Sequence, residues 1–123
     1  MYAVNWKDLP ETEGLPNNFR AAVAGWEMGV NRIRWVHPTA LPEHVHDDAE
    51  QSIMMIEGKI QFTIDGHEME LSAGDVAIVP RGAVHSGHSI EGEAVFIEVF
   101  APARYENLTG FLGEPARATA GEA

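Results

Sequence analysis

Short runs of alternating apolar and polar residues, each bounded by a turn signal, make up most of this chain. Apolar side chains at every second position are typical of strands that bury one face. The pair Asp65-Gly66 separates two such runs, and this spacing is a strong signal for a two-residue β-hairpin. No long amphipathic helix interrupts the series. We expect strands over residues 19–23, 30–36, 41–46, 51–57, 59–64, 67–71, 75–79 and 94–100.

Many short strands at regular spacing predict an all-β, antiparallel sandwich or barrel, of which a double-sheet jelly roll is one form. The 123 residues, 45% of them hydrophobic, are enough for one domain with a real core. We expect an N-terminal arm over residues 1–18 with one helical turn near Asp8. A jelly-roll β-barrel should follow over 19–112, and a flexible tail over 113–123. Residues 105–112 carry a weak pattern for a short helix.

The formal net charge of −11 argues against nucleic acid and anionic membranes as partners, because like charges repel. The chain has no cysteine, so any metal must be held by nitrogen and oxygen ligands. No apolar run approaches the length of a membrane span, and we expect a cytoplasmic protein. The six arginines suit carboxylates, although we expect most of them to be solvated surface charges. They are Arg20, Arg32, Arg34, Arg81, Arg104 and Arg117.

The run Ile53-Met54-Met55-Ile56 breaks the alternation, because it is apolar on both faces. A central strand covered on both sides would explain it, and so would an interface between two copies of the chain. We expect a homodimer.

His44 and His46 stand one residue apart in a strand-like context, so their side chains project from the same side of the backbone. Imidazole is the commonest protein ligand for metals, and such a pair is half of a possible metal site.

Histidines occur in two spaced motifs of the chain, the first of which contains His44 and His46. The first reads His44-Val45-His46, four residues, Gln51, six residues and Gly58; the second reads Gly74, five residues, Pro80-Arg81-Gly82, two residues and His85. The pattern resembles the two motifs of the cupin superfamily over roughly residues 30–102. The resemblance implies a small jelly-roll barrel with a metal near its centre. Three positions depart from the motifs: Pro38 replaces the usual Gly, Gln51 the commoner Glu, and Ser89 the usual Asn.

The resemblance implies His44, His46, Gln51 and His85 as metal ligands. The spacing also makes physical sense, because a turn before His85 would bring a later strand beside the first pair. One divalent transition metal, nickel, iron, manganese or zinc, would suit three imidazoles and an amide oxygen. A histidine cluster without metal, satisfied by hydrogen bonds, is the alternative. His88 could face a substrate, and its role is left open.

The amide of Gln51 leaves the charge of a divalent ion uncompensated. Such an ion is a better Lewis acid for polarising a carbonyl or hydroxyl, which argues mildly against oxygen activation.

In the run from Ala94 to Phe100, Glu98 shares one face with Phe96 and Phe100. If this face points inward, Glu98 is a candidate general acid/base. If it points outward, Glu98 is a solvated surface charge. Arg104 would stand at the barrel mouth, where it could hold a carboxylate.

The closing segment Glu98-Val-Phe-Ala-Pro-Ala-Arg104 is similar to that of KdgF-type uronate-metabolising cupins. Those enzymes open the ring of 4,5-unsaturated uronates, and the family segment usually has Asp where this chain has Glu98. The resemblance implies Glu98 as the acid/base, Phe100 as a pocket wall and Arg104 as the carboxylate clamp. Apolar residues including Met55 and Phe62 should also line the pocket.

Three functions are consistent with the residues. The first is a metal-dependent enzyme for a small carboxylated substrate, most concretely a ring-opening isomerase. The second is an iron-dependent dioxygenase, or a cupin that modifies a polyketide or aromatic compound. The third is a metabolite- or sugar-binding cupin without catalysis.

Overall fold

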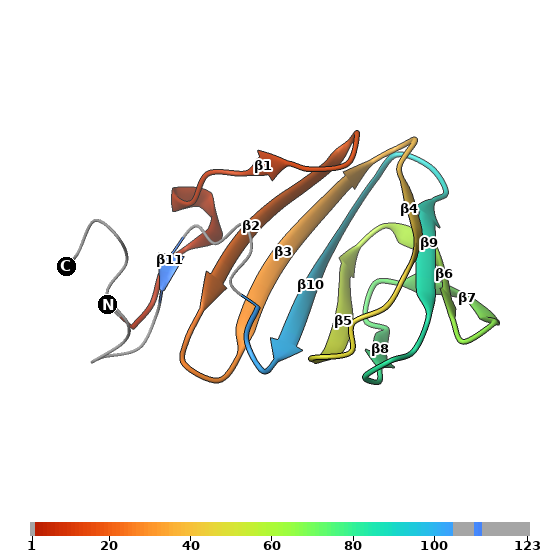
Figure 1. Cartoon of the computed structure of the whole chain (residues 1–123). Coiled ribbons are helices and arrows are strands. Elements are labelled where there is room, and N and C mark those ends of the chain that lie inside the picture. Colours follow the sequence, from red (N-terminus) through yellow and green to blue (C-terminus); the bar gives the residue numbers. More distant parts are fainter. Residues whose placement is uncertain (1, 105–109, 112–123) are drawn as a thin grey trace.

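Two β-sheets face each other in the computed structural model, which describes residues 2–104 and 110–111 (Figure 1). The larger sheet has the strand order β1-β2-β3-β10-β5-β8, with β11 beside β2, and the smaller has the order β4-β9-β6-β7. The larger sheet contains β1 (Thr12–Glu13), β2 (Asn18–Ala24), β3 (Gly29–Val36), β5 (Glu50–Glu57), β8 (Val76–Val79), β10 (Glu93–Ala101) and β11 (Gly110–Phe111). The smaller contains β4 (Ala40–His44), β6 (Lys59–Ile64), β7 (His67–Ser72) and β9 (His85–Ser89). A 3-10 turn, η1, spans Trp6–Asp8.

This architecture confirms the predicted all-β, double-sheet jelly roll. All strand pairs except β11–β2 are antiparallel. The hairpin between β6 and β7 turns at Asp65-Gly66, where both φ angles are positive, as a two-residue turn requires. The helix expected over 105–112 is wrong at residues 110–111, which form the strand β11. The rest of that segment and the tail expected over 113–123 lie outside the described residues.

Three strands were not predicted: β1, β9 and β11. β9 reads His-Ser-Gly-His-Ser, which lacks the β-branched and aromatic residues that favour strands. It pairs with β4 on one side and β6 on the other, so its neighbours fix its conformation.

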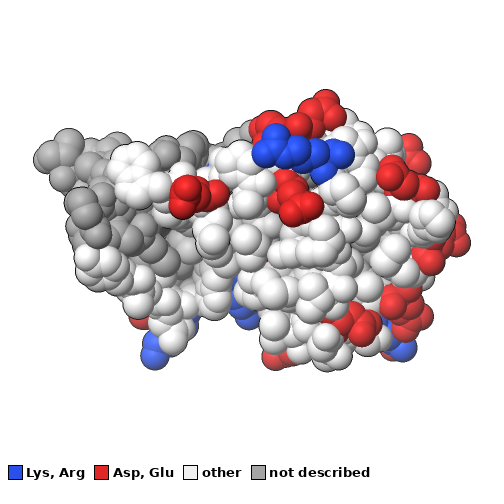
Figure 2. All heavy atoms as spheres, turned by 90° about the horizontal axis from the view of Figure 1, so that it is seen from below, with Lys and Arg blue, Asp and Glu red and all other residues white. Residues whose placement is uncertain are grey.

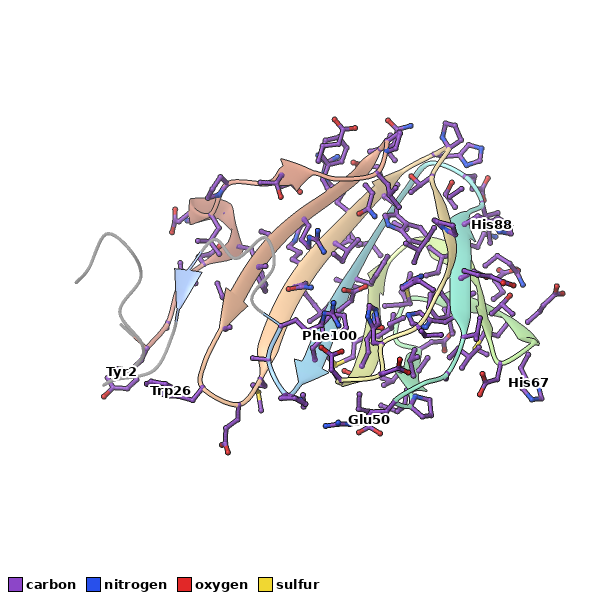
Figure 3. The ribbon with its side chains drawn as sticks, viewed as in Figure 1. Tyr2, Trp26, Glu50, His67, His88 and Phe100 are labelled. Atoms are coloured by element: carbon purple, nitrogen blue, oxygen red, sulfur yellow. The ribbon has the colours of Figure 1, made fainter. Side chains whose placement is uncertain are left out.

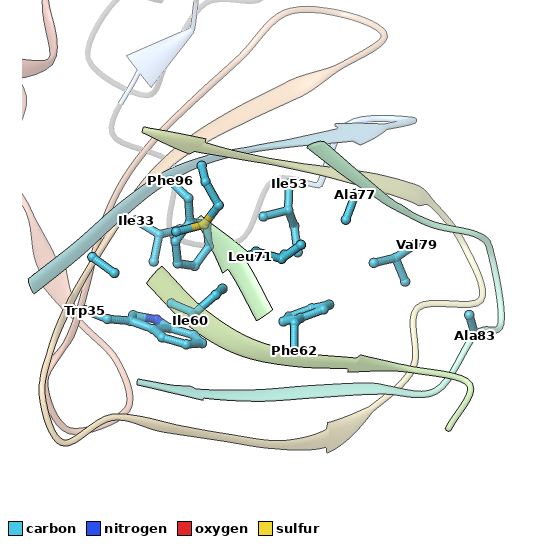
Figure 4. Packing of buried hydrophobic residues seen from close by; sticks show 12 residues of the cluster. Ile33, Trp35, Ile53, Ile60, Phe62, Leu71, Ala77, Val79, Ala83 and Phe96 are labelled. Carbon is cyan, nitrogen blue, oxygen red and sulfur yellow. The ribbon is translucent and has the colours of Figure 1, made fainter. Parts of the chain in front are cut away.

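The core lies between the two sheets, whose inward side chains meet in Figure 4. Trp35 of β3 packs edge-to-face against Phe96 of β10, with ring centroids 5.2 Å apart. Ile53 of β5 and Phe62 of β6 are almost completely buried in the same cluster. This packing fills one part of the space between the sheets and leaves the other part for polar groups.

The two halves of the larger sheet differ on their outer face. The N-terminal arm lies beside β3, because Glu11 pairs with Arg34 at 2.9 Å. Further along the sheet, Met54 of β5 lies beside Val76 of β8, and Val76 and Ile78 are 63% and 51% exposed.

Figure 2 shows acidic side chains spread over the face seen from below, with few basic ones. Within the described residues, no helix is long and apolar enough to cross a membrane.

Candidate metal centre and pocket

Three imidazoles converge at one end of the space between the sheets. His44 ends β4, His46 follows it, and His85 begins β9; their candidate ligand nitrogens all lie within 4.8 Å of one another. His44 and His85 are direct cross-strand partners, which brings together residues far apart in the sequence. The backbone N–H of Gly82 donates to the carbonyl of His46 at 2.9 Å, from a turn with φ of 76° that suits glycine.

Backbone carbonyls orient two of the rings. Nδ1 of His44 lies 2.8 Å from the carbonyl oxygen of Pro42, and Nδ1 of His85 lies 2.9 Å from that of Ala83. A ring nitrogen that faces a carbonyl must carry the proton, so Nε2 of each neutral ring keeps its lone pair. Burial, helped by the positive charge of Arg104, lowers the pKa of His46 to about 4, and burial also lowers the pKa of His85. His46 and His85 are therefore neutral at pH 7 and able to act as ligands.

Two buried lone-pair atoms at this centre have no hydrogen-bond partner among the described residues: Oε1 of Gln51 and Nε2 of His85. Buried polar atoms are rarely left unpaired in native proteins, so these two need a partner. A set of three imidazole nitrogens and one amide oxygen fits a divalent transition metal. His44, His46, Gln51 and His85 would hold it.

A cavity of about 130 Å³ extends from the imidazoles between the sheets. His44, His46 and Gln51 line it on the metal side. Beyond them its polar lining comprises Asn18 and Arg20 of β2, Asn31 of β3, Glu98 of β10 and Arg104. Ile33, Trp35, Leu41 and Phe100 supply the apolar walls.

Glu98 faces this cavity and is partly buried. It is the register partner of Asn31 on β3, and Nδ2 of Asn31 donates to its Oε2 at 3.3 Å. Burial raises the pKa of the Glu98 carboxyl, and the hydrogen bond from Asn31 and the charge of Arg20 offset part of this shift. A carboxyl so placed can hold or release a proton beside a bound molecule.

Phe100 and Arg104 also line the cavity. The Phe100 ring meets His46 edge-on, with centroids 5.4 Å apart, and the guanidinium carbon of Arg104 lies 5.6 Å from the centre of the same ring. Nη1 of Arg104 donates to Oδ1 of Asp48 at 2.8 Å. Arg104 is thus already engaged by a carboxylate of the chain itself. Figure 3 shows Phe100 on β10, beside the space between the two sheets.

Met55 and Phe62, the other two residues expected at the pocket, lie in the packed core and are not among its lining residues. Both face inward, but they belong to the part of the interior that side chains fill. His88 is exposed, because alternation along β9 turns it away from the face that carries His85. Glu50 is exposed beside Gln51, and Figure 3 shows His67, His88 and Glu50 at the periphery of the molecule.

The structure adds cavity residues that sequence reasoning did not single out: Asn18, Arg20, Asn31 and Trp35. One signal was available for Arg20. It is the one charged residue in the run Phe-Arg-Ala-Ala-Val-Ala, and a charged side chain in an otherwise apolar strand is an informative exception.

Comparison with known proteins gives consistent matches. A model of the cupin domain matches residues 35–100. Quercetin 2,3-dioxygenase of Bacillus subtilis is 30% identical over 76 residues, which is 62% of this chain and 23% of that protein. An uncharacterized protein of Aquifex aeolicus is 29% identical over 59 residues, 48% of this chain and 49% of the relative. The chain therefore spans a quarter to a half of these relatives.

Solved structures share the fold. KdgF from Halomonas sp. superimposes with a TM-score of 0.79 at 18% identity, over 85% of this chain and 96% of that one. An RmlC-like cupin from Shewanella frigidimarina gives a TM-score of 0.77 at 21% identity, over 85% and 93%. With the domain match over residues 35–100 and the histidine centre between two sheets, the chain belongs to the cupin family.

Proposed function

We propose that this protein is a metal-dependent enzyme that acts on a small, polar, carboxylated molecule. The observation that carries the proposal is one cavity that joins a neutral ligand set to an acidic side chain: His44, His46 and Gln51 line it together with Glu98. The guanidiniums of Arg20 and Arg104, also in the lining, favour an anionic substrate.

The most concrete version is ring opening of a 4,5-unsaturated uronate to its linear keto form. A divalent metal at the three imidazoles would act as a Lewis acid towards an oxygen of the substrate. Glu98 would take the proton of the hemiacetal hydroxyl as the bond between C1 and the ring oxygen breaks. The resulting enol at C5 becomes a ketone when C4 receives a proton. No atom is gained or lost, so one acid/base residue is enough.

The aromatic ring of Phe100 would support one side of the sugar ring, and Arg104 would meet the substrate at the edge of the cavity. Both roles follow from the resemblance of the closing segment, and the lining of the cavity supports them.

The test is turnover of an unsaturated uronate by protein of known metal content, followed through loss of the ultraviolet absorbance of the C4=C5 bond. Glu98→Gln should lower kcat about 10²- to 10⁴-fold without changing the bound metal. Arg104→Ala should raise KM. His88→Ala, on the exposed face of β9, is the matched control and should behave like the parent. A parent that leaves the absorbance unchanged would refute the uronate assignment.

An iron-dependent dioxygenase is the second candidate, because the segment that matches quercetin 2,3-dioxygenase is 30% identical. Oxygen uptake with iron, but not with nickel or zinc, would select it. A tight ligand without turnover would instead favour the third class, a non-catalytic binding protein.

We also propose a homodimer formed through the exposed outer face of β5 and β8. Val76, Met54 and Ile97 stand in one row across three paired strands of that face. None of them is charged, whereas a net charge of −11 makes two copies repel elsewhere. A cytoplasmic location stays a prediction.

A further inference from the structure

Four buried side-chain polar atoms lack a hydrogen-bond partner in the described part of the chain, and they are of two chemical kinds. Oε1 of Gln51 and Nε2 of His85 offer lone pairs, which suit a cation. Nε of Arg20 and Nε1 of Trp35 carry hydrogens and can only donate. A metal cannot satisfy a donor, so the second pair requires a different partner, one with acceptor oxygens.

The two donors stand on the same face of the larger sheet. In the pairing of β2 with β3, Arg20 is opposite Ile33 and Asn18 is opposite Trp35, so Arg20 and Trp35 are diagonal neighbours. Diagonal neighbours on one face lie about 7–8 Å apart at the backbone, within reach of a long side chain. Both line the cavity that also holds Glu98. Their N–H groups can therefore address one small ligand.

The guanidinium of Arg20 interacts with Glu98 through its charge, which helps to lower the pKa of that carboxyl, but the two groups form no direct ion pair. Among the described residues no carboxylate forms an ion pair with Arg20 within 4.0 Å, and Glu98 accepts its hydrogen bond from Asn31 instead. Arg104, by contrast, is paired with Asp48 at 2.8 Å. Of the two guanidiniums in the cavity, Arg20 is the one with donor capacity to spare.

There is also room beside it. A second cavity of about 140 Å³ adjoins the first, and Asn18, Arg20 and Leu41 line both. Gly14 and Leu15 of the N-terminal arm also line the second cavity. Arg20 thus stands where the two cavities meet, and a group that it holds can extend in either direction.

We propose that Arg20 and Trp35 form the anion-binding subsite of this cupin and hold the carboxylate of its substrate, with the metal centre at the other end of the cavity. The subsite rests on the proposed function only for the identity of the carboxylated molecule. It makes Arg20, rather than Arg104, the residue that selects carboxylated over neutral substrates. Trp35 adds a second, uncharged donor, and its burial fixes its direction.

The test uses the full chain loaded with zinc, which is diamagnetic, and follows the arginine Nε–H and tryptophan Nε1–H signals by NMR. Galacturonate is the carboxylated probe and galactose the neutral one; acetate and succinate test carboxylates without a sugar. The Arg20 and Trp35 signals, assigned from the variants, should shift with carboxylates and not with galactose. Arg20→Gln should weaken galacturonate binding about 10- to 100-fold, the usual loss when a hydrogen bond to a charged group is removed. Trp35→Phe should weaken it less, because a neutral donor is lost.

Arg32→Gln is the matched control, because it removes the same charge from the outer face of the adjacent strand, where Arg32 lies 3.6 Å from Glu11. It should bind galacturonate like the parent. If Arg20→Gln binds as tightly as Arg32→Gln, or if no carboxylate moves the Arg20 signal, the subsite is refuted. Failure of uronate turnover in the parent with intact carboxylate binding at Arg20 would refute the proposed reaction and leave the subsite standing.

Discussion

Metal binding should stabilise this protein by an amount set by the two unpaired lone-pair atoms at its centre. Each unsatisfied buried polar atom costs about 1–3 kcal/mol. Oε1 of Gln51 and Nε2 of His85 therefore lower the free energy of unfolding of the metal-free protein by about 2–6 kcal/mol, and a bound cation removes this loss. For a domain of this length, 1 kcal/mol corresponds to about 4 °C in Tm. Saturating metal should raise Tm by about 8 °C or more.

Differential scanning calorimetry of protein stripped with a chelator and then reloaded with nickel or zinc measures this rise. His44→Ala removes one ligand and leaves both unpaired atoms in place, so it should abolish most of the rise. His88→Ala lies on the same strand as His85 but on its exposed face, and it should keep the full rise. A rise below about 2 °C in the parent, or an equal rise in His44→Ala, would refute the metal centre.

Acid should loosen the N-terminal arm. The hydrogen bond from Arg34 holds the pKa of the Glu11 carboxyl below its usual 4.5. The stabilising contribution of the Glu11 carboxylate is therefore present above pH 4.5 and is lost as the pH falls through the lowered pKa. Hydrogen exchange in the arm should rise over that pH range, and Glu11→Gln should show fast exchange at every pH. Phe62→Ala should lower the free energy of unfolding in urea by about 3–5 kcal/mol, and a loss below 1 kcal/mol would contradict its place in the core. If the proposed homodimer forms, Ile78→Lys should convert it to a monomer in light scattering, and a monomeric parent would disprove the proposal.

Strands with one apolar face were predictable because alternation and turn residues are local signals. The hairpin at Asp65-Gly66 depends on two adjacent residues, and it forms as expected. β9 was missed because its five residues have no intrinsic preference for a strand and pair only in the context of β4 and β6. Local preference and tertiary context agree in the first case and differ in the second.

The candidate site shows the same division. His44 and His46 follow from local spacing, whereas the cross-strand pair of His44 with His85 required a family pattern. Alternation predicted that Phe62 faces inward, but it contains no information on which part of the interior is filled and which is hollow. The place of Arg20 in the cavity could not be predicted for a related reason: strand pairing, which is not a local signal, places it beside Ile33 and Trp35.

The position of β10 in the larger sheet has a consequence for the order of assembly. This strand lies between β3 and β5, although it is synthesised long after both (Figure 1). Until residue 101 has left the ribosome, the edges of β3 and β5 that pair with β10 have no partner, and unpaired edges promote aggregation. The proposed ligands from His44 to His85 all precede β10, whereas Glu98 belongs to it. A nascent chain therefore has its proposed metal ligands before it has Glu98, the proposed acid/base, and the proposed reaction would require the strand that closes the sheet.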